Sequence, residues 1–254
     1  MTRVRGAGVM IGGLLALSAV WCTDIPTSDN AVLSVAIDSL PAPAVVLGAT
    51  LRDSTGRAVP IHATAYNFKG VVVANATERF HSLDAGIRVD SITGFATADS
   101  LRSTPARILI TIGALQAIQN LDVTLRPDTV SAVNARDSLL YSLLDTTKNV
   151  SPGLAVRVLH SLTSADSAVK SYLVSFAIVS PADTLLASLV NDGGNASRID
   201  TTDATGTASR RIRLEPVRLK SLTDSIVVQA TVKYRGAQVR GSPVKIVLKV
   251  KPAS

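Results

Sequence analysis

The sequence predicts an all-β protein built of two β-sandwiches in tandem, and three observations support this prediction. Apolar and polar residues alternate with a period of two at several places, whereas no long segment has the spacing of an amphipathic helix. The 254 residues are 46% hydrophobic but only 4% aromatic, so Val, Ile, Leu and Ala dominate, as in many half-buried strands. Gly, Pro, Asn and Asp recur between the apolar runs, where tight turns need them. Disorder is excluded, because it requires low hydrophobicity and high charge, and only 18% of the residues are charged.

The first 22 residues predict a signal peptide. Arg3 and Arg5 form a charged start, and an uncharged, mostly apolar run follows from Gly8 to Val20. This run is too short for a stable membrane span, which needs about 20 apolar residues. We therefore expect an exported protein.

Cys22 is the single cysteine of the chain, which excludes an internal disulfide and a cysteine-built metal cage. The segment 17–22 resembles a bacterial lipobox, and this resemblance implies lipidation of Cys22 and an outer-membrane lipoprotein. The segment departs from the pattern at Trp21, where a small residue is usual, and at Ala19, where Leu is usual. Two alternatives stay open. Cleavage after Ser18 would release a soluble periplasmic or secreted protein with a free thiol, or Cys22 belongs to the discarded peptide.

The first strand-rich block runs from about residue 31 to residue 126. Its apolar runs predict strands at 31–37, 44–51, 61–68, 71–74, 107–112 and 120–125. The segments 53–56 and 90–94 place Asp early and Gly late, as tight turns between strands prefer.

The second block runs from about residue 128 to residue 252. Its apolar runs predict strands at 139–144, 154–159, 172–179, 208–214, 226–234 and 244–250, with turns at 191–195 and 203–206. In the clearest strand, one face carries Ile226, Val228, Ala230, Val232 and Tyr234.

The last strand is expected to lie at the edge of its sheet. Ile246, Leu248 and Val250 should point inward, while Lys245, Lys249 and Lys251 lie on the opposite face. Lysines on an edge strand are a common protection against unwanted sheet pairing.

Each block offers about six or seven short strands, the number found in an immunoglobulin-like sandwich. We therefore predict two tandem immunoglobulin-like β-sandwiches after an N-terminal signal peptide, with the signal peptide at 1–22 and domains at 28–127 and 128–254. The blocks join near Pro127. The disulfide and core tryptophan of antibody domains are missing, and Tyr66 or Phe68 is the candidate to replace the tryptophan in the first block.

Two segments carry a family resemblance. The segment 200–208, DTTDATGTA, resembles the T-D-x-x-G-x-A signature of invasin/intimin-type bacterial Ig-like domains, and the strand at 224–231 and the Gly-Ser-Pro at 241–243 fit the same pattern. The segment 89–98 is similar to the turn and strand of another bacterial Ig-like group. The resemblance implies a tandem module of the cell envelope that spaces, presents or adheres, and it implies no catalytic residues.

The sequence offers few groups for catalysis. The three histidines, His62, His81 and His160, are the candidate bases, but none lies in a nucleophile motif and no G-x-S-x-G elbow is present. Their spacing does not fit a zinc site, and the phosphate-binding loop and the dinucleotide fingerprint are absent. We predict a protein that is not an enzyme, with no catalytic residues, no cofactor and no metal. A pocket that brings a histidine and a carboxylate within hydrogen-bond reach would favour the alternative of an unrecognised enzyme.

Two polar groups in the second block leave further alternatives. The segment 191–195 with Asp200 and Asp203 offers oxygen ligands for calcium, but the same residues are typical of a surface turn, which we favour. We expect the basic residues to form a solvated strand face; the alternative is contact with an anionic polysaccharide or lipid. These residues are Arg210, Arg211, Arg213, Arg218 and Lys220.

The expected partner is an envelope or extracellular protein or polysaccharide, with a lipid anchor if Cys22 is acylated. Removal of the signal peptide takes away Arg3 and Arg5, so the net charge falls from +7 to +5 (24 basic minus 19 acidic residues), and this basic excess permits attraction to anionic envelope polymers. Nucleic acid is not expected, because neither interleaved aromatics nor a groove-entering helix is visible. A carbohydrate- or anionic-polymer-binding accessory protein is the alternative function, although only four Tyr and four Phe are available as binding platforms.

Overall fold

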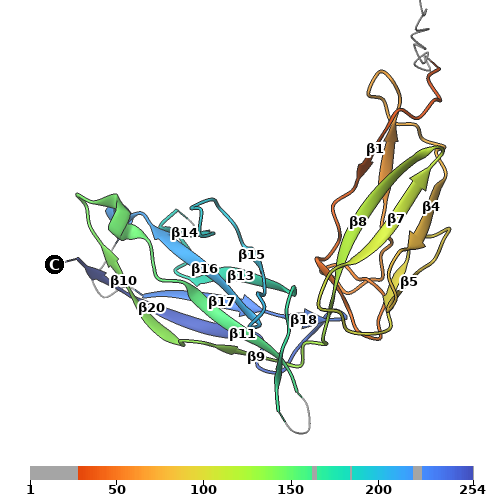
Figure 1. The fold of residues 1–254 in the computed structure, drawn as a ribbon. Helices are drawn as coiled ribbons and strands as arrows, with labels where there is room; N and C mark the ends of the chain where they lie inside the picture. The colour runs from red at the N-terminus through yellow and green to blue at the C-terminus, as the bar shows by residue number, and fades with distance from the viewer. Residues whose placement is uncertain (1–27, 162–164, 184, 220–224, 254) are drawn as a thin grey trace, which may run out of the picture.

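The computed structural model describes residues 28–161, 165–183, 185–219 and 225–253. Within these ranges the chain consists of strands, turns and two short 3-10 helices, and the strands form two elongated bodies (Figure 1). The predicted all-β fold class is confirmed. The signal peptide and Cys22 lie outside the described residues. No helix in the described ranges is long and apolar enough to span a membrane.

The first sandwich has one continuous sheet, in the order β2-β8-β7-β4. Strand β2 pairs with β8 in parallel, and the other pairs in this sheet are antiparallel. The opposite layer consists of the pairs β1–β3 and β5–β6, and the Ile61 amide joins them by donating to the Gly94 carbonyl at 3.0 Å. The strands are β1 (Ser34–Ile37), β2 (Ala44–Val46), β3 (Ala63–Tyr66), β4 (Glu78–Ser82), β5 (Ile87–Val89), β6 (Ala96–Ala98), β7 (Ala106–Ile112) and β8 (Leu115–Thr124).

The second sandwich has two larger sheets. One has the order β10-β20-β17-β13-β15, and the other has the order β12-β11-β16-β14, with β9 also paired to β11. The strands are β9 (Thr129–Ala132), β10 (Arg136–Tyr141), β11 (Leu154–His160), β12 (Ser167–Ala168), β13 (Leu173–Ser180), β14 (Ala187–Val190), β15 (Ile199–Thr201), β16 (Thr207–Leu214), β17 (Ser225–Thr231), β18 (Lys233–Tyr234), β19 (Ala237–Gln238) and β20 (Val244–Pro252). The 3-10 helices are η1 (Thr146–Asn149) and η2 (Pro216–Arg218).

Both sandwiches share an immunoglobulin-like arrangement. In each, an early strand pairs in parallel with the last strand: β2 with β8, and β10 with β20. The last strand also pairs antiparallel with a second strand, β8 with β7 and β20 with β17. Strands β7 and β17 pair in turn with the strand that carries a buried phenylalanine. The phenylalanine is Phe80 on β4 in the first sandwich and Phe176 on β13 in the second. This position corresponds to the core tryptophan of antibody domains.

The prediction that Tyr66 or Phe68 fills the core of the first sandwich is wrong. Phe68 is 41% exposed and Tyr66 is half-buried, whereas Phe80 is 4% exposed. The strand that carries Phe80 was not predicted, because Phe80 is the one apolar residue in Glu78–Ser82. A strand with a single apolar residue among polar and charged ones shows no alternation of apolar and polar residues.

The predicted inward faces of two strands in the second sandwich are confirmed. Ile226, Val228, Ala230 and Val232 are buried, and so are the three inward residues of β20, which are Ile246, Leu248 and Val250. The prediction that the last strand is an edge strand is wrong, because β20 lies between β10 and β17 and pairs with both. Its lysines are exposed on the outer face of the sheet. A solvated face therefore says nothing about the backbone partners of a strand.

Candidate functional site at the junction of the two sandwiches

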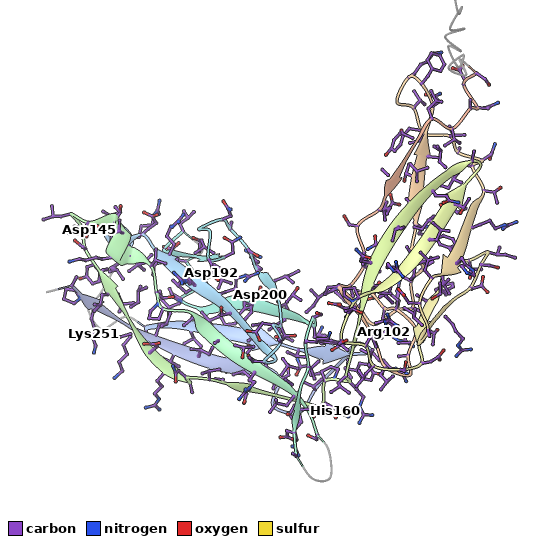
Figure 2. The ribbon with its side chains drawn as sticks, viewed as in Figure 1. Arg102, Asp145, His160, Asp192, Asp200 and Lys251 are labelled. Carbon is purple, nitrogen blue, oxygen red and sulfur yellow. The ribbon has the colours of Figure 1, made fainter. Side chains whose placement is uncertain are left out.

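Side-chain hydrogen bonds join the two sandwiches where β8 ends. The Thr124 hydroxyl donates to the Lys170 carbonyl at 2.5 Å, and the Ser171 hydroxyl donates to the Asp122 carboxylate at 2.6 Å. The Lys170 ammonium also donates to the Arg102 carbonyl at 3.3 Å. Arg102 lies at this end of the first sandwich, while Asp145 and Lys251 lie at the far end of the second (Figure 2).

A second contact joins two tight turns. The Asp53 carboxylate accepts hydrogen bonds from the Thr55 amide at 2.9 Å, the Thr55 hydroxyl at 2.7 Å and the Arg57 amide at 3.0 Å. The hydroxyl bond is the main reason that the pKa of Asp53 lies below its usual value. This turn brings Gly56, at φ +89, against the backbone of the β18–β19 hairpin.

Only glycine fits at the point where these turns meet. A Cβ on Gly56 would lie 2.3 Å from the Gly236 nitrogen and 2.4 Å from the Arg235 carbonyl carbon. Both distances are far inside van der Waals contact, and the positive φ is itself unfavourable for a side chain. The two sandwiches are therefore in direct backbone contact here.

A cavity of about 110 Å³ lies beside this contact and is lined by both sandwiches. Much of its lining is apolar, with Ala44, Val46 and Ala49 from the first sandwich and Leu173 and Ile199 from the second. Aromatic side chains complete the second half of the wall.

The aromatic wall consists of Tyr172 and Tyr234. The Tyr172 hydroxyl donates to the Lys233 carbonyl at 2.6 Å, and burial raises the pKa of this phenol. The Arg235 guanidinium lies 5.3 Å from the centre of the Tyr234 ring, which is cation–π geometry. Arg235 also has a positive φ of 51°, an uncommon conformation for a residue with a side chain.

The lining of the cavity is positively charged. Arg52, Lys233 and Arg235 all line it, and within the described ranges none of them forms an ion pair with a carboxylate. Asp53 is the acidic residue of the lining, and its carboxylate is engaged by its own turn. The Arg52 Nη1 donates to the Gly56 carbonyl at 2.7 Å, but its buried Nε has no acceptor.

The structure brings one histidine within hydrogen-bond reach of a carboxylate. The His160 Nδ1 lies 2.6 Å from the Asp128 carboxylate, which also accepts from the Arg126 Nε at 2.7 Å and from the Ser161 amide at 3.0 Å. Neither His160 nor Asp128 lines the junction cavity. Two donors, the Arg126 Nε and the Ser161 amide, therefore hold Asp128 at the linker between the sandwiches, and the His160 ring lies beside it.

The other two histidines lie apart from this linker. The His62 Nδ1 is 3.6 Å from the Glu78 carboxylate, and His81 is exposed on β4. Their separate positions give no shared site.

The carboxylates considered as calcium ligands have other partners. Asp192 lies 3.1 Å from the Arg211 Nε, Asp200 lies 2.8 Å from the Arg210 Nη1, and Asp203 accepts bonds within its own turn. The part of the chain that the structure describes contains no group of three or more His, Cys, Asp or Glu residues placed to hold a metal ion.

The prediction that Arg210 belongs to a solvated strand face is wrong. Alternate residues of β16 point inward, and Arg210, which is 9% exposed, points between the sheets and pairs with Asp200 near β15. Arg213 is exposed and Arg211 half-buried on the opposite face, Arg218 is exposed in η2, and Lys220 lies outside the described residues. Strict alternation in the strand would have identified the inward arginine.

Sequence reasoning missed the residues of the junction. The turn at 53–56 was predicted, but no site was predicted at Arg52, Tyr172 or Arg235. The Asp-Ser-Thr-Gly pattern indicates the turn, but nothing in it indicates which surface the turn contacts.

No protein family model matches the chain, and no curated protein matches it by sequence. The chain is similar to solved structures at low levels. Domains 4 and 5 of the S-layer protein SbsC share 11% identity over 87% of this chain and 98% of that chain, with a TM-score of 0.30. Repeats EC1-2 of human protocadherin-24 share 13% over 88% and 100%, with a TM-score of 0.28. The Escherichia coli adhesin FdeC shares 12% over 85% and 63%, with a TM-score of 0.30. None of these similarities assigns the chain to a family.

Proposed function

We propose that this chain is an exported, non-catalytic module of the cell envelope that acts as a spacer or adhesion protein, with two Ig-like domains that meet near Pro127. The junction is the observation that supports this proposal. Three side-chain hydrogen bonds and one backbone contact cross it, and Pro127 in the linker is buried. A spacer needs such a fixed geometry, because a flexible linker lets two domains reorient freely.

The hydrogen bonds across the junction support a structural role. The Thr124 and Ser171 hydroxyls donate to groups of the neighbouring sandwich, so they help to hold the two sandwiches together. The proposed partner is an envelope or extracellular protein or polysaccharide, and Cys22 is the proposed attachment point for an outer-membrane lipid anchor.

A distance measurement tests the fixed geometry. Spin labels at Ile92→Cys and Leu144→Cys, two exposed positions in different sandwiches, report the separation of the sandwiches by double electron–electron resonance in a Cys22→Ala background. We expect a single narrow distance distribution, which broadens when Gly56→Val is added. A broad distribution in the parent protein would overturn the spacer proposal.

Cell fractionation tests the anchor. We expect the parent protein in the membrane with an acylated Cys22 by intact-mass analysis, and the Cys22→Ala variant in the soluble fraction. An unmodified Cys22, or both proteins in the soluble fraction, would reject the lipoprotein proposal and leave a periplasmic or secreted protein.

A second candidate function, an accessory protein that binds carbohydrate or an anionic polymer, is favoured by the charged lining of the junction cavity. The ligand class that fits this lining is derived below.

A further inference from the structure

We propose that the junction cavity binds one acidic sugar unit, such as a uronic acid residue of an anionic polysaccharide. This inference goes beyond the spacer function, because a spacer needs the junction but no ligand. It rests on the charge, the walls and the position of the cavity.

The charge of the cavity calls for an anion. Three cations line it, and Asp53 uses its carboxylate in its own turn. Within the described ranges none of the three cations has a carboxylate partner, so the chain does not neutralise their charge. A carboxylate in the cavity would lie among residues that carry these three charges.

The walls of the cavity call for a ring. Tyr172 and Tyr234 are two of the four tyrosines in the chain, and both line this one cavity beside apolar residues of both sandwiches. A pyranose ring has apolar C–H faces that pack on aromatic and aliphatic walls, while its hydroxyl groups remain available for polar contacts. Inorganic phosphate would leave the apolar walls without a partner.

The size of the cavity favours one ring over a long acyl chain. Its volume is about 110 Å³. This is less than the volume of about 150 Å³ with which a closed apolar cavity holds a benzene molecule, so the cavity, which is partly open to solvent, takes part of one sugar ring and leaves the rest of the sugar outside. A fatty acid shares the carboxylate with a uronic acid, but its chain would extend far beyond this space.

The position of the cavity couples the ligand to the junction. Arg52 comes from the first sandwich, and Lys233 and Arg235 come from the second, so a bound anion contacts both. Because the ligand contacts both sandwiches, binding stabilises their contact, and the stabilisation rises with the logarithm of the ligand concentration above the Kd. We therefore expect the sugar to narrow the distance distribution of a variant with a weakened junction.

The test is isothermal titration calorimetry of the protein from residue 28 onward with a trisaccharide of galacturonic acid. The comparison ligands are the neutral galactose trisaccharide and inorganic phosphate. The variant is Lys233→Gln/Arg235→Gln, in which both side chains are exposed and folding is not at risk. The matched control is Arg79→Gln with Lys249→Gln, which removes the same charge from exposed positions outside the cavity lining.

We expect the acidic trisaccharide to bind, the neutral sugar and phosphate to bind at least tenfold more weakly, and the cavity variant to lose at least tenfold in affinity. The control should stay within about twofold of the parent. If the variant and the control lose the same affinity, binding depends on the net charge of the protein and not on the cavity, and the inference is rejected. If phosphate or the neutral sugar binds as tightly as the acidic trisaccharide, the proposed ligand class is rejected. An absence of binding at millimolar sugar, with a narrow distance distribution retained, would overturn this inference and leave the spacer function intact.

Discussion

The two sandwiches share a topology but have different cores. Both pair an early strand in parallel with the last one and both bury one phenylalanine at the same strand position. Among the described residues, the first core has 15 buried residues, five of them alanine, whereas the second has 21, three of them alanine. Since burial of apolar area is the main favourable contribution to folding, the second sandwich should be the more stable of the two.

Their ion pairs differ as well. In the first sandwich the half-buried carboxylate of Asp84 lies at the surface beside Arg102 and Arg107. The second places Arg210 and Asp200 between its two sheets. The first sandwich therefore places its ion-pair network at the surface beside a small core, while the second places one ion pair inside a larger core.

The largest expected effects come from the two phenylalanines. We expect Phe176→Ala and Phe80→Ala each to lower the free energy of unfolding of their own sandwich by about 3 to 5 kcal/mol, because each leaves a cavity in a packed core. Calorimetry with hydrogen exchange should show the first sandwich unfolding at the lower temperature in the parent protein.

The milder Phe80→Leu and Phe176→Leu serve as controls if either alanine variant fails to fold. A single transition that both variants shift equally would contradict the view that the two cores are independent. Earlier unfolding of the second sandwich would contradict the ranking by core size.

The inward ion pair gives the next effect. Asp200→Ala leaves the Arg210 guanidinium buried without its carboxylate, and we expect a loss of about 3 kcal/mol in the second sandwich. Asp192→Ala is the matched control, because its partner pair with Arg211 is largely exposed and should contribute less than about 1 kcal/mol. Urea unfolding monitored by circular dichroism measures the free energy of unfolding of both variants. Equal losses would show that burial of the ion pair between the sheets does not increase its contribution to stability.

Substitutions at two turn glycines distinguish the contribution of the junction from that of the core. Gly56 and Gly206 end the same kind of Asp turn, but a Cβ on Gly206 would lie 2.5 Å from the Val158 carbonyl oxygen within its own sandwich. We expect Gly206→Ala to destabilise the second sandwich by more than about 1 to 2 kcal/mol, which is the cost of a left-handed residue alone.

Gly56→Ala should instead broaden the distance distribution between the sandwiches while each still unfolds near its parent temperature. The control is Gly70→Ala, at φ +72 with open space around it. It should show only the cost of the left-handed backbone, with neither a broadened distance distribution nor the additional destabilisation expected for Gly206→Ala. A Gly56→Ala protein with an unchanged narrow distribution would show that the turn contact does not hold the junction.

The sequence predicted the fold better than the site, and particular residues show why. Val228, Ala230 and Val232 alternate with the polar residues Gln229 and Thr231, so their strand and its inward face follow from local spacing. Phe80 stands among charged neighbours, and its burial depends on pairing with β7, which is distant in sequence. Arg52 and Arg235 are 183 positions apart in numbering, and only the contact between two folded sandwiches brings them to one cavity. Local patterns predict strands and turns, but they carry no information about which turns meet.

The smallest expected effect concerns pH and the rim of the first sandwich. The Asp84 carboxylate accepts from the Arg107 amide and guanidinium, and these hydrogen bonds lower its pKa from 3.8 to about 2. A carboxyl group whose pKa is lower in the folded state stabilises the fold above its unfolded pKa and loses that contribution as the pH falls through the folded value. We therefore expect the difference in melting temperature between the parent protein and Asp84→Asn to shrink between about pH 4 and pH 2. The second sandwich, which does not contain Asp84, provides the internal reference, and its melting temperature should be the same in the two proteins at every pH. A difference that stays constant down to pH 2 would mean that Asp84 acts through its shape and not through its charge.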